Sequence, residues 1–313
     1  MSAVTTAERP GAAASTGPAP VPKSRKRWTR FILPVYTALF IAYLIVPIVV
    51  MIIFSFNTPE GRFNIRWEGA SLDAWRNLFF EPQLTESLIL TLQLAVVSTI
   101  LATILGTFLG IALGRYRFAG AGLMGFVIFL AIASPEIILG SSLLTMFVNA
   151  QVPLGFPTLV LAHVMFSLSF VAITVRARVQ GMDPALEEAA GDLGATPRTT
   201  FFKVTLPLIM PGVISGALLA FALSIDDFVI SNFVKGTLTT FPLWVFGATR
   251  QGLPPQVNVM GTLLFLFGLS IVVVQLFAAS RKARKERREA ALSRVIPSTD
   301  IDVAPVPLRS RPR

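Results

Sequence analysis

The 313-residue sequence contains no cysteine, which excludes disulfide bonds and sites that bind a metal through thiolates. Its single histidine, His163, lies in an apolar run, where a packed, hydrogen-bonded imidazole is a more common role than a ligand. No Gly-Lys dipeptide occurs, so the phosphate-binding loop of P-loop ATPases is missing. The residue pattern also offers no pairing of a nucleophile with a base. We therefore expect a chain that is not an enzyme and does not hydrolyse ATP itself.

Charged residues are scarce as well. They make up 14% of the chain, whereas 53% of the residues are hydrophobic and the mean hydropathy is +0.69. Soluble globular domains are about 25% charged. The composition therefore indicates an integral membrane protein.

Six apolar segments are long enough to cross a membrane, which requires about 20 residues of helix. They are expected near residues 31–54, 87–113, 123–148, 157–175, 206–225 and 257–279. The first follows basic residues, as a signal peptide would, but it exceeds the roughly 7 to 15 apolar residues of such a peptide, so we expect an uncleaved span. The sequence thus predicts an all-α membrane protein with six transmembrane helices.

The basic residues are distributed unevenly between the two sides of these spans. If the N-terminus is cytoplasmic, only five of the 27 Lys and Arg fall on the outer side: Arg62, Arg66, Arg76, Lys235 and Arg250. Cytoplasmic loops carry an excess of Lys and Arg, so both termini are expected inside. The net charge of +10 is then a topology signal, with attraction to lipid headgroups as a second effect. Nucleic acid is not expected as a partner, because the basic tails lack a folded module.

The ends of the chain differ in composition from the apolar body. Residues 1–29 are expected to form a disordered, basic cytoplasmic tail, and residues 30–280 the six-span domain. Residues 281–313 are expected to form a second basic tail, partly disordered, whose first part, residues 281–294, prolongs the last span as a helix.

A polar stretch between the fourth and fifth spans carries helix start and stop signals. Asp183-Pro184 suits an N-cap and first turn, and Gly194 suits the left-handed position that ends a helix, which predicts a short helix over residues 184–193. Thr196-Pro197 repeats the start signal, and the second helix is expected to continue until Pro207 disturbs it. A solvated linker would explain the prolines and glycine but not two capped helices between membrane spans.

The same stretch has the composition of a docking surface. Its small residues Ala189, Ala190 and Gly191 allow a partner to approach closely. The neighbouring Glu187 and Glu188 supply negative charge for Arg or Lys of that partner.

The spacing within this stretch resembles a known signature. Glu188-Ala189-Ala190 is followed by three residues, Gly194, nine residues and Val204-Thr205-Leu206-Pro207. This resembles the EAA signature of permease subunits in bacterial ABC-type importers, E-A-A, three residues, G, nine residues, I-x-L-P, with valine for isoleucine as the one departure. The resemblance covers roughly residues 30–280 and implies the type I ABC importer permease fold, with a coupling helix in the loop at residues 181–206.

In that family the coupling helix sits in a cleft of a cytoplasmic ATPase subunit, so the resemblance also implies partners. These are a second permease in a heterodimer, two ATPase subunits that bind ATP and Mg²⁺, and an extracytoplasmic solute-binding protein. The chain would lie in the bacterial inner membrane and bind no cofactor or metal. The residues implied in ATPase coupling are Glu187, Glu188, Ala189, Ala190, Gly194, Ala195, Phe201, Leu206 and Pro207.

Three other segments bear on the cargo. Residues 134–140, 223–233 and 252–258 are similar to permeases for spermidine and putrescine, in particular to the second of the two permeases in such importers. Permeases for ferric iron and other small solutes share parts of these patterns. The resemblance therefore favours polyamines and leaves another solute open.

Carboxylates within or beside the spans are candidates for a cation pathway. An ionised Glu136 facing lipid in the third span would cost roughly 2.5 to 3.5 kcal/mol, so it should face the pathway or form a structural hydrogen bond near Pro135. At the outer end of the fifth span, Asp226 and Asp227 could attract a diamine or triamine. Adjacent residues point in different directions, so we expect at most one to line the pathway while the other caps or pairs structurally. The competing interpretation is an ion-coupled secondary transporter with these residues as ion or proton sites.

Overall fold

The computed structural model describes residues 29–295, so most of the predicted tail at residues 1–29 and the last part of the predicted tail at residues 281–313 lie outside the described residues. The chain divides into two units, residues 1–50 and 51–313. The first unit holds most of helix α1 (Thr29–Phe54), an apolar helix that matches the first predicted span.

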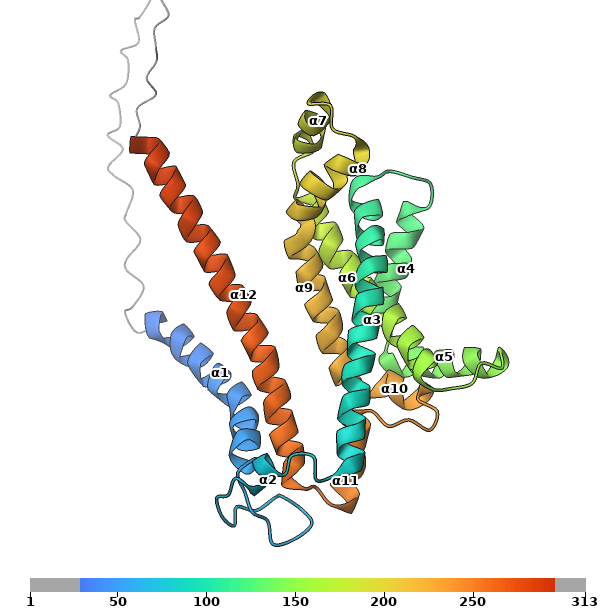
Figure 1. The fold of residues 1–313 in the computed structure, drawn as a ribbon, viewed down its shortest axis with the longest axis vertical. Helices are drawn as coiled ribbons and strands as arrows, with labels where there is room; N and C mark the ends of the chain where they lie inside the picture. Colours follow the sequence, from blue (N-terminus) through green and yellow to red (C-terminus); the bar gives the residue numbers. More distant parts are fainter. Residues whose placement is uncertain (1–28, 296–313) are drawn as a thin grey trace, which may run out of the picture. The chain divides into compact units, whose positions relative to one another are not determined.

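The second unit is helical throughout (Figure 1). Its elements in chain order are α2 (Asp73–Arg76), α3 (Pro82–Arg115), α4 (Ala121–Ala133), α5 (Glu136–Asn149), α6 (Phe156–Gln180), α7 (Ala185–Asp192), α8 (Pro197–Thr200), the π-helical turn η1 (Phe201–Thr205), α9 (Leu206–Asp226), α10 (Val229–Val234), α11 (Phe241–Gln251) and α12 (Pro255–Val295). The only β pairing among the described residues consists of two isolated bridges. The helix that carries the sixth span continues to Val295, as predicted for residues 281–294.

Five helices of the described chain are long and apolar enough to span a membrane, and a sixth span requires α4 and α5 together. Sequence analysis expects one span over residues 123–148, but these two helices are bent by 108° where they meet. The cause is Pro135, which disfavours the helical conformation at the preceding Ser134 and leaves both residues extended, with ψ of 136° and 132°. Glu136 is therefore the first residue of α5 and not the middle of a continuous helix.

The predicted helical pair is present. α7 lies within residues 184–193, Gly194 has a φ of +81°, and the Thr196 hydroxyl accepts a hydrogen bond from the Thr199 amide at 3.3 Å. The expected disturbance at Pro207 is milder than a helix end, because the chain stays helical from Pro197 to Asp226. A π-helical turn precedes this proline, which has no N–H to donate, and shifts the hydrogen bonding by one residue.

Helices α3, α6 and α9 pack side by side and form the core that carries this loop (Figure 1). Three glycines of α3, each four residues from the next, face three valines of α6 with the same spacing: Gly106, Gly110 and Gly114, and Val171, Val175 and Val179. A Cβ atom at Gly110 would lie 2.7 Å from the carbonyl oxygen of Ala172. Small residues at this spacing let two membrane helices approach closely, which is how the backbones of α3 and α6 come into contact.

Candidate functional site

The loop between α6 and α9 presents an exposed surface at one end of the core. No residue of α7 is buried, and Glu188, Ala189 and Gly194 are all exposed. Leu193 is 89% exposed at the end of α7, and Leu186 of the same helix is half-exposed. Apolar side chains held in water on an ordered loop are typical of a protein interface. Sequence analysis did not identify the two leucines, although an apolar residue directly before Gly194 in a polar helix was the available signal.

Glu187 has a different role from the one its sequence position indicates. Its carboxylate lies 2.5 Å from the Arg115 guanidinium, and it accepts a hydrogen bond from the Thr205 hydroxyl at 2.8 Å. Its side chain is 23% exposed. Glu187 therefore joins α7 to the end of α3 and to η1. Glu188 is rotated by about 100° around the helix and is left free to contact a partner.

The remaining residues of the predicted signature lie behind this surface. Ala195 and Phe201 line a cavity of about 320 Å³ between the loop and the ends of α3 and α6. Leu206 packs against the core of α6 and α9, and Ala190 is half-buried. Pro207 is exposed at the start of α9. The signature therefore combines outward-facing residues at the α7 tip with inward-facing residues that seat the loop.

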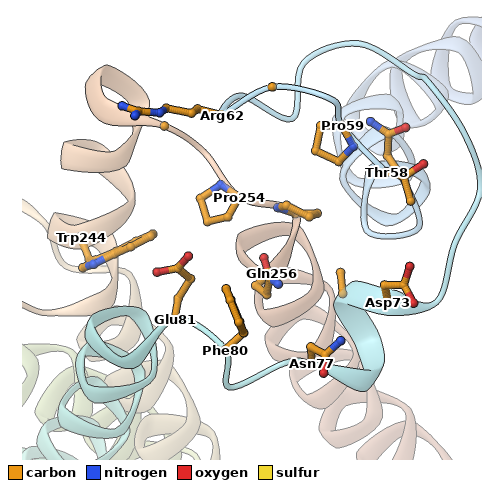
Figure 2. Close-up of a pocket in the computed structure, with 15 residues that line it drawn as sticks. Thr58, Pro59, Arg62, Asp73, Asn77, Phe80, Glu81, Trp244, Pro254 and Gln256 are labelled. Carbon is orange, nitrogen blue, oxygen red and sulfur yellow. The ribbon is translucent and has the colours of Figure 1, made fainter.

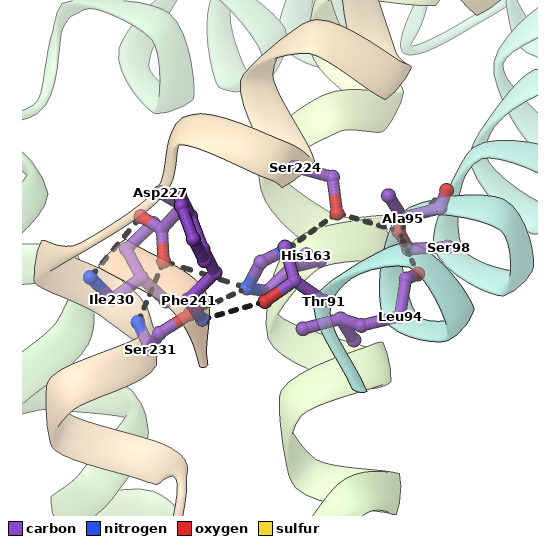
Figure 3. Close-up of polar contacts among 10 residues, drawn as sticks. All are labelled: Thr91, Leu94, Ala95, Ser98, His163, Ser224, Asp227, Ile230, Ser231 and Phe241. Atoms are coloured by element: carbon purple, nitrogen blue, oxygen red, sulfur yellow. Dashed lines mark hydrogen bonds and ion pairs between the residues drawn. The ribbon is translucent and has the colours of Figure 1, made fainter. Parts of the chain in front are cut away.

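The two adjacent aspartates at the end of α9 point into different surroundings, as expected: the Asp227 side chain is buried and Asp226 is exposed. Asp227 is the structural one: its side chain is 5% exposed, and it accepts hydrogen bonds from the amides of Ile230 and Ser231 at 3.2 and 2.7 Å (Figure 3). It also lies 3.4 Å from Nε2 of His163. Asp227 thus caps α10 and fixes the point where the chain turns out of α9.

His163 is at the centre of a buried polar network. It is 3% exposed, with Nδ1 2.8 Å from the Ser224 hydroxyl and Nε2 2.9 Å from the Ser231 hydroxyl (Figure 3). Ser224 in turn lies 3.0 Å from Ser98. This confirms the predicted packed, hydrogen-bonded histidine. The network joins α3, α6, α9 and α10 at the break between the last two.

Asp226 and Glu136 remain exposed beside this network. Asp226 ends α9 and lines a cavity of about 680 Å³ whose other walls are α9 and α12. Glu136 begins α5, which packs on α10, the helix that directly follows Asp226 and Asp227 in the chain. Among the described residues, none donates a hydrogen bond to the Glu136 carboxylate. The fold thus brings together carboxylates from two distant segments, two of them open to a ligand.

Comparison with known proteins identifies the family. The model of the binding-protein-dependent transport system inner membrane component family matches residues 102–285, which include the loop between α6 and α9, His163, Glu136, Asp226 and Asp227. The chain belongs to this family. Among curated relatives, this permease is 38% identical over 234 residues to the spermidine/putrescine transport system permease protein PotC of Haemophilus influenzae, covering 74% of this chain and 90% of that protein. It is 37% identical over 253 residues to the putrescine transport system permease protein PotI of Escherichia coli K12, covering 78% and 89%.

Solved structures agree with the family on the fold. A chain of a bacterial ABC transporter involved in the import of the acidic polysaccharide alginate superposes with a TM-score of 0.60, covering 84% of this permease and 99% of that chain. The sequence identity is 16%, so this likeness concerns the fold alone. The permease therefore has the type I ABC importer fold predicted from its sequence.

Family membership answers one question that the sequence left open. The family is that of binding-protein-dependent transport systems, which favours the importer permease over the ion-coupled secondary transporter. The family match includes the whole loop from α6 to α9. The permease is a transport component of the inner membrane.

Proposed function

We propose that this permease forms half of the translocation pathway of an ATP-driven importer for polyamines. The observation that carries the proposal is its identity of 37 to 38%, over three quarters of its length, to permeases named for spermidine and putrescine. The chemistry of the pathway supports it, because the exposed Glu136 and Asp226 offer negative charge to a cationic cargo. A permease for ferric iron or another small solute is the second candidate, since carboxylates also suit other cations.

We propose that other subunits complete this importer. The chain lacks a P-loop, so ATP and Mg²⁺ would bind to two cytoplasmic ATPase subunits, and this permease would carry no cofactor or metal of its own. A second permease would form the other half of the pathway, and an extracytoplasmic binding protein would deliver the cargo. Glu188, Ala189 and Gly194, with Leu193 between them, would contact an ATPase subunit.

The proposed topology places both termini and the α7 loop in the cytoplasm. The ion pair between Arg115 and Glu187 supports this, because it holds the end of α3 and the loop on one side of the core. Arg62, Arg76 and Arg250 belong to segments at the other end of α3, where basic residues are few. The distribution follows the excess of Lys and Arg in cytoplasmic loops.

Glu188→Ala and Leu193→Ala are each expected to lower uptake roughly tenfold or more, the effect of truncating a residue at the centre of an interface. Both side chains are exposed and contact nothing that holds the fold, so insertion and thermal stability should be unchanged. Uptake and ATPase activity of the assembled complex in proteoliposomes would be measured together. Normal coupled transport by both variants would contradict the proposed docking surface.

Glu187→Ala is the contrasting variant one residue away. It removes both the ion pair with Arg115 and the acceptor for Thr205, so it is expected to lower the melting temperature of the permease as well as its uptake. A loss of uptake with no change in melting temperature would return Glu187 to the docking surface.

The cargo is tested with the binding protein present. Spermidine or putrescine bound to that protein is expected to stimulate the ATPase activity of the reconstituted complex several-fold over the unloaded protein. Stimulation by another solute, such as ferric iron, and by no polyamine would overturn the cargo assignment and leave the importer assignment intact.

A further inference from the structure

A third cavity, shown in Figure 2, is lined by residues at the start of α3, whereas the α7 loop lies at the other end of that helix. Its volume is about 570 Å³, within the roughly 300 to 1,000 Å³ of sites for small molecules. Its walls come from the loop before α2, from α2 itself, from the residues that lead into α3, and from α11 with the turn into α12. It is separate from the cavity that contains Asp226, because the two share no lining residue.

The wall formed by the loop before α2 is held in place by buried hydrogen bonds. Asn57 is 2% exposed; its amide donates to Asn64 Oδ1 and to the Arg66 carbonyl, both at 2.6 Å, and accepts from the Glu68 amide at 2.9 Å. The Asn64 amide N–H donates to the Leu253 carbonyl at 2.9 Å, which ties the loop to the turn before α12. The cavity is therefore a built feature of the fold.

Two polar side chains inside this cavity, those of Gln256 and Glu81, have no hydrogen-bond or ion-pair partner among the described residues. The Gln256 side chain points into it, and this residue is 9% exposed (Figure 2). Among the described residues, none forms a hydrogen bond with its side-chain amide, which is open to the cavity. Glu81 points into the same space, is half-buried, and has no salt bridge within the part of the chain that is described. Both groups lack the partner that a cationic hydrogen-bond donor would supply.

Aromatic rings complete the cavity. Phe80 lies beside Gln256 and Trp244 beside Glu81, and ring faces attract ammonium groups that approach within about 6 Å. The charged lining residues are Glu81 and Asp73 against Arg62, which gives a net negative charge. In Figure 2 the Arg62 guanidinium points away from Glu81. A carboxylate, an amide oxygen and aromatic rings together suit a primary ammonium and not an anion.

We propose that this cavity is an outer binding site for an alkyl diamine or triamine, in which Glu81 and the Gln256 amide oxygen accept hydrogen bonds from an ammonium group while Phe80 and Trp244 cover its carbon chain. The cargo would occupy this site after leaving the binding protein and before it reaches Asp226. This proposal rests on polyamine import and adds a site to it.

Glu81→Gln tests the site in the intact importer complex in lipid nanodiscs, with spermidine as the probe and no binding protein present. The measurement uses a complex that also carries Asp226→Asn, so that the pathway carboxylate does not contribute. Binding is expected to weaken on the order of tenfold, because a charge-assisted hydrogen bond is lost. Phe80→Ala is expected to weaken it several-fold; Phe80 is 72% exposed, so this variant should fold normally.

Glu60→Gln is the matched control, because Glu60 is exposed on the loop before α2, carries the same charge as Glu81 and does not line the cavity. It should leave spermidine binding unchanged. If Glu81→Gln and the control bind spermidine equally well, the proposed outer site is wrong, even if polyamine uptake is normal. Weaker docking of the binding protein with unchanged spermidine binding also overturns it, because the cavity would then hold a lysine of that protein. Failure of every polyamine to stimulate the complex is a different result and removes the proposed cargo itself.

Discussion

Replacing Asp227 with alanine is expected to destabilise the permease by about 3 kcal/mol or more, because it leaves buried hydrogen-bond donors without their acceptor. The substitution leaves His163 without its carboxylate and leaves the amides of Ile230 and Ser231 without an acceptor. Each buried donor without a partner costs about 1 to 3 kcal/mol. The start of α10 and the break after α9 should therefore lose their fixed geometry.

The neighbouring Asp226 is the control for this prediction. Asp226→Ala removes an exposed carboxylate with no hydrogen-bond partner in the described chain, so stability should be unchanged while uptake of the cationic cargo falls. Stability is measured by thermal unfolding of the detergent-solubilised complex, with elution from a size-exclusion column as a single species as the readout of folded complex. Uptake is measured in proteoliposomes. Equal melting temperatures for the two variants would show that Asp227 has no structural role.

The ends of the spans were predictable because length and apolar composition largely determine them. The span at residues 206–225 corresponds to α9, Leu206–Asp226, and the span at 157–175 lies within α6, Phe156–Gln180. The bend between α4 and α5 was missed, because hydropathy is continuous across residues 123–148 and does not register the effect of Pro135 on backbone conformation. A proline preceded by serine in the middle of a span was the available signal.

Some features of the candidate sites depend on neighbouring residues in the sequence, and others depend on residues far apart in it. Gly194 and Thr196 act on their own backbone, so the capped helices of the loop were predictable from the sequence. The role of Glu187 depends on Arg115, which is 72 residues away, and no local pattern specifies that pairing. The same holds for His163, whose partner Ser224 is 61 residues away. Such contacts follow from the packing of α3, α6 and α9, which one sequence does not determine.

The packing of α3 on α6 leads to the second large prediction. Gly110→Leu is expected to destabilise the permease by about 3 kcal/mol or more, the upper end of the range for overpacking. A Cβ atom at this position would already lie 2.7 Å from the carbonyl oxygen of Ala172 and 2.8 Å from Cβ of Val175. The first of these atoms is backbone, so the contact is relieved only if the two helices move apart. Separation of α3 and α6 would also displace Ser98 from Ser224 and Arg115 from Glu187.

Gly122→Leu is the matched control, because Gly122 is also a helical glycine and nothing lies within 4 Å of the Cβ position there. Thermal unfolding in detergent and the yield of the assembled complex should be near wild type for this variant and strongly reduced for Gly110→Leu. Equal stability of the two variants would mean that the close approach of α3 and α6 is not required for folding. The comparison matters for function, because α3 contacts α11 near one end and the α7 loop at the other. The helix has 34 residues and is about 50 Å long. A shift of α3 against α6 would therefore reach both the proposed outer amine site and the proposed ATPase contact.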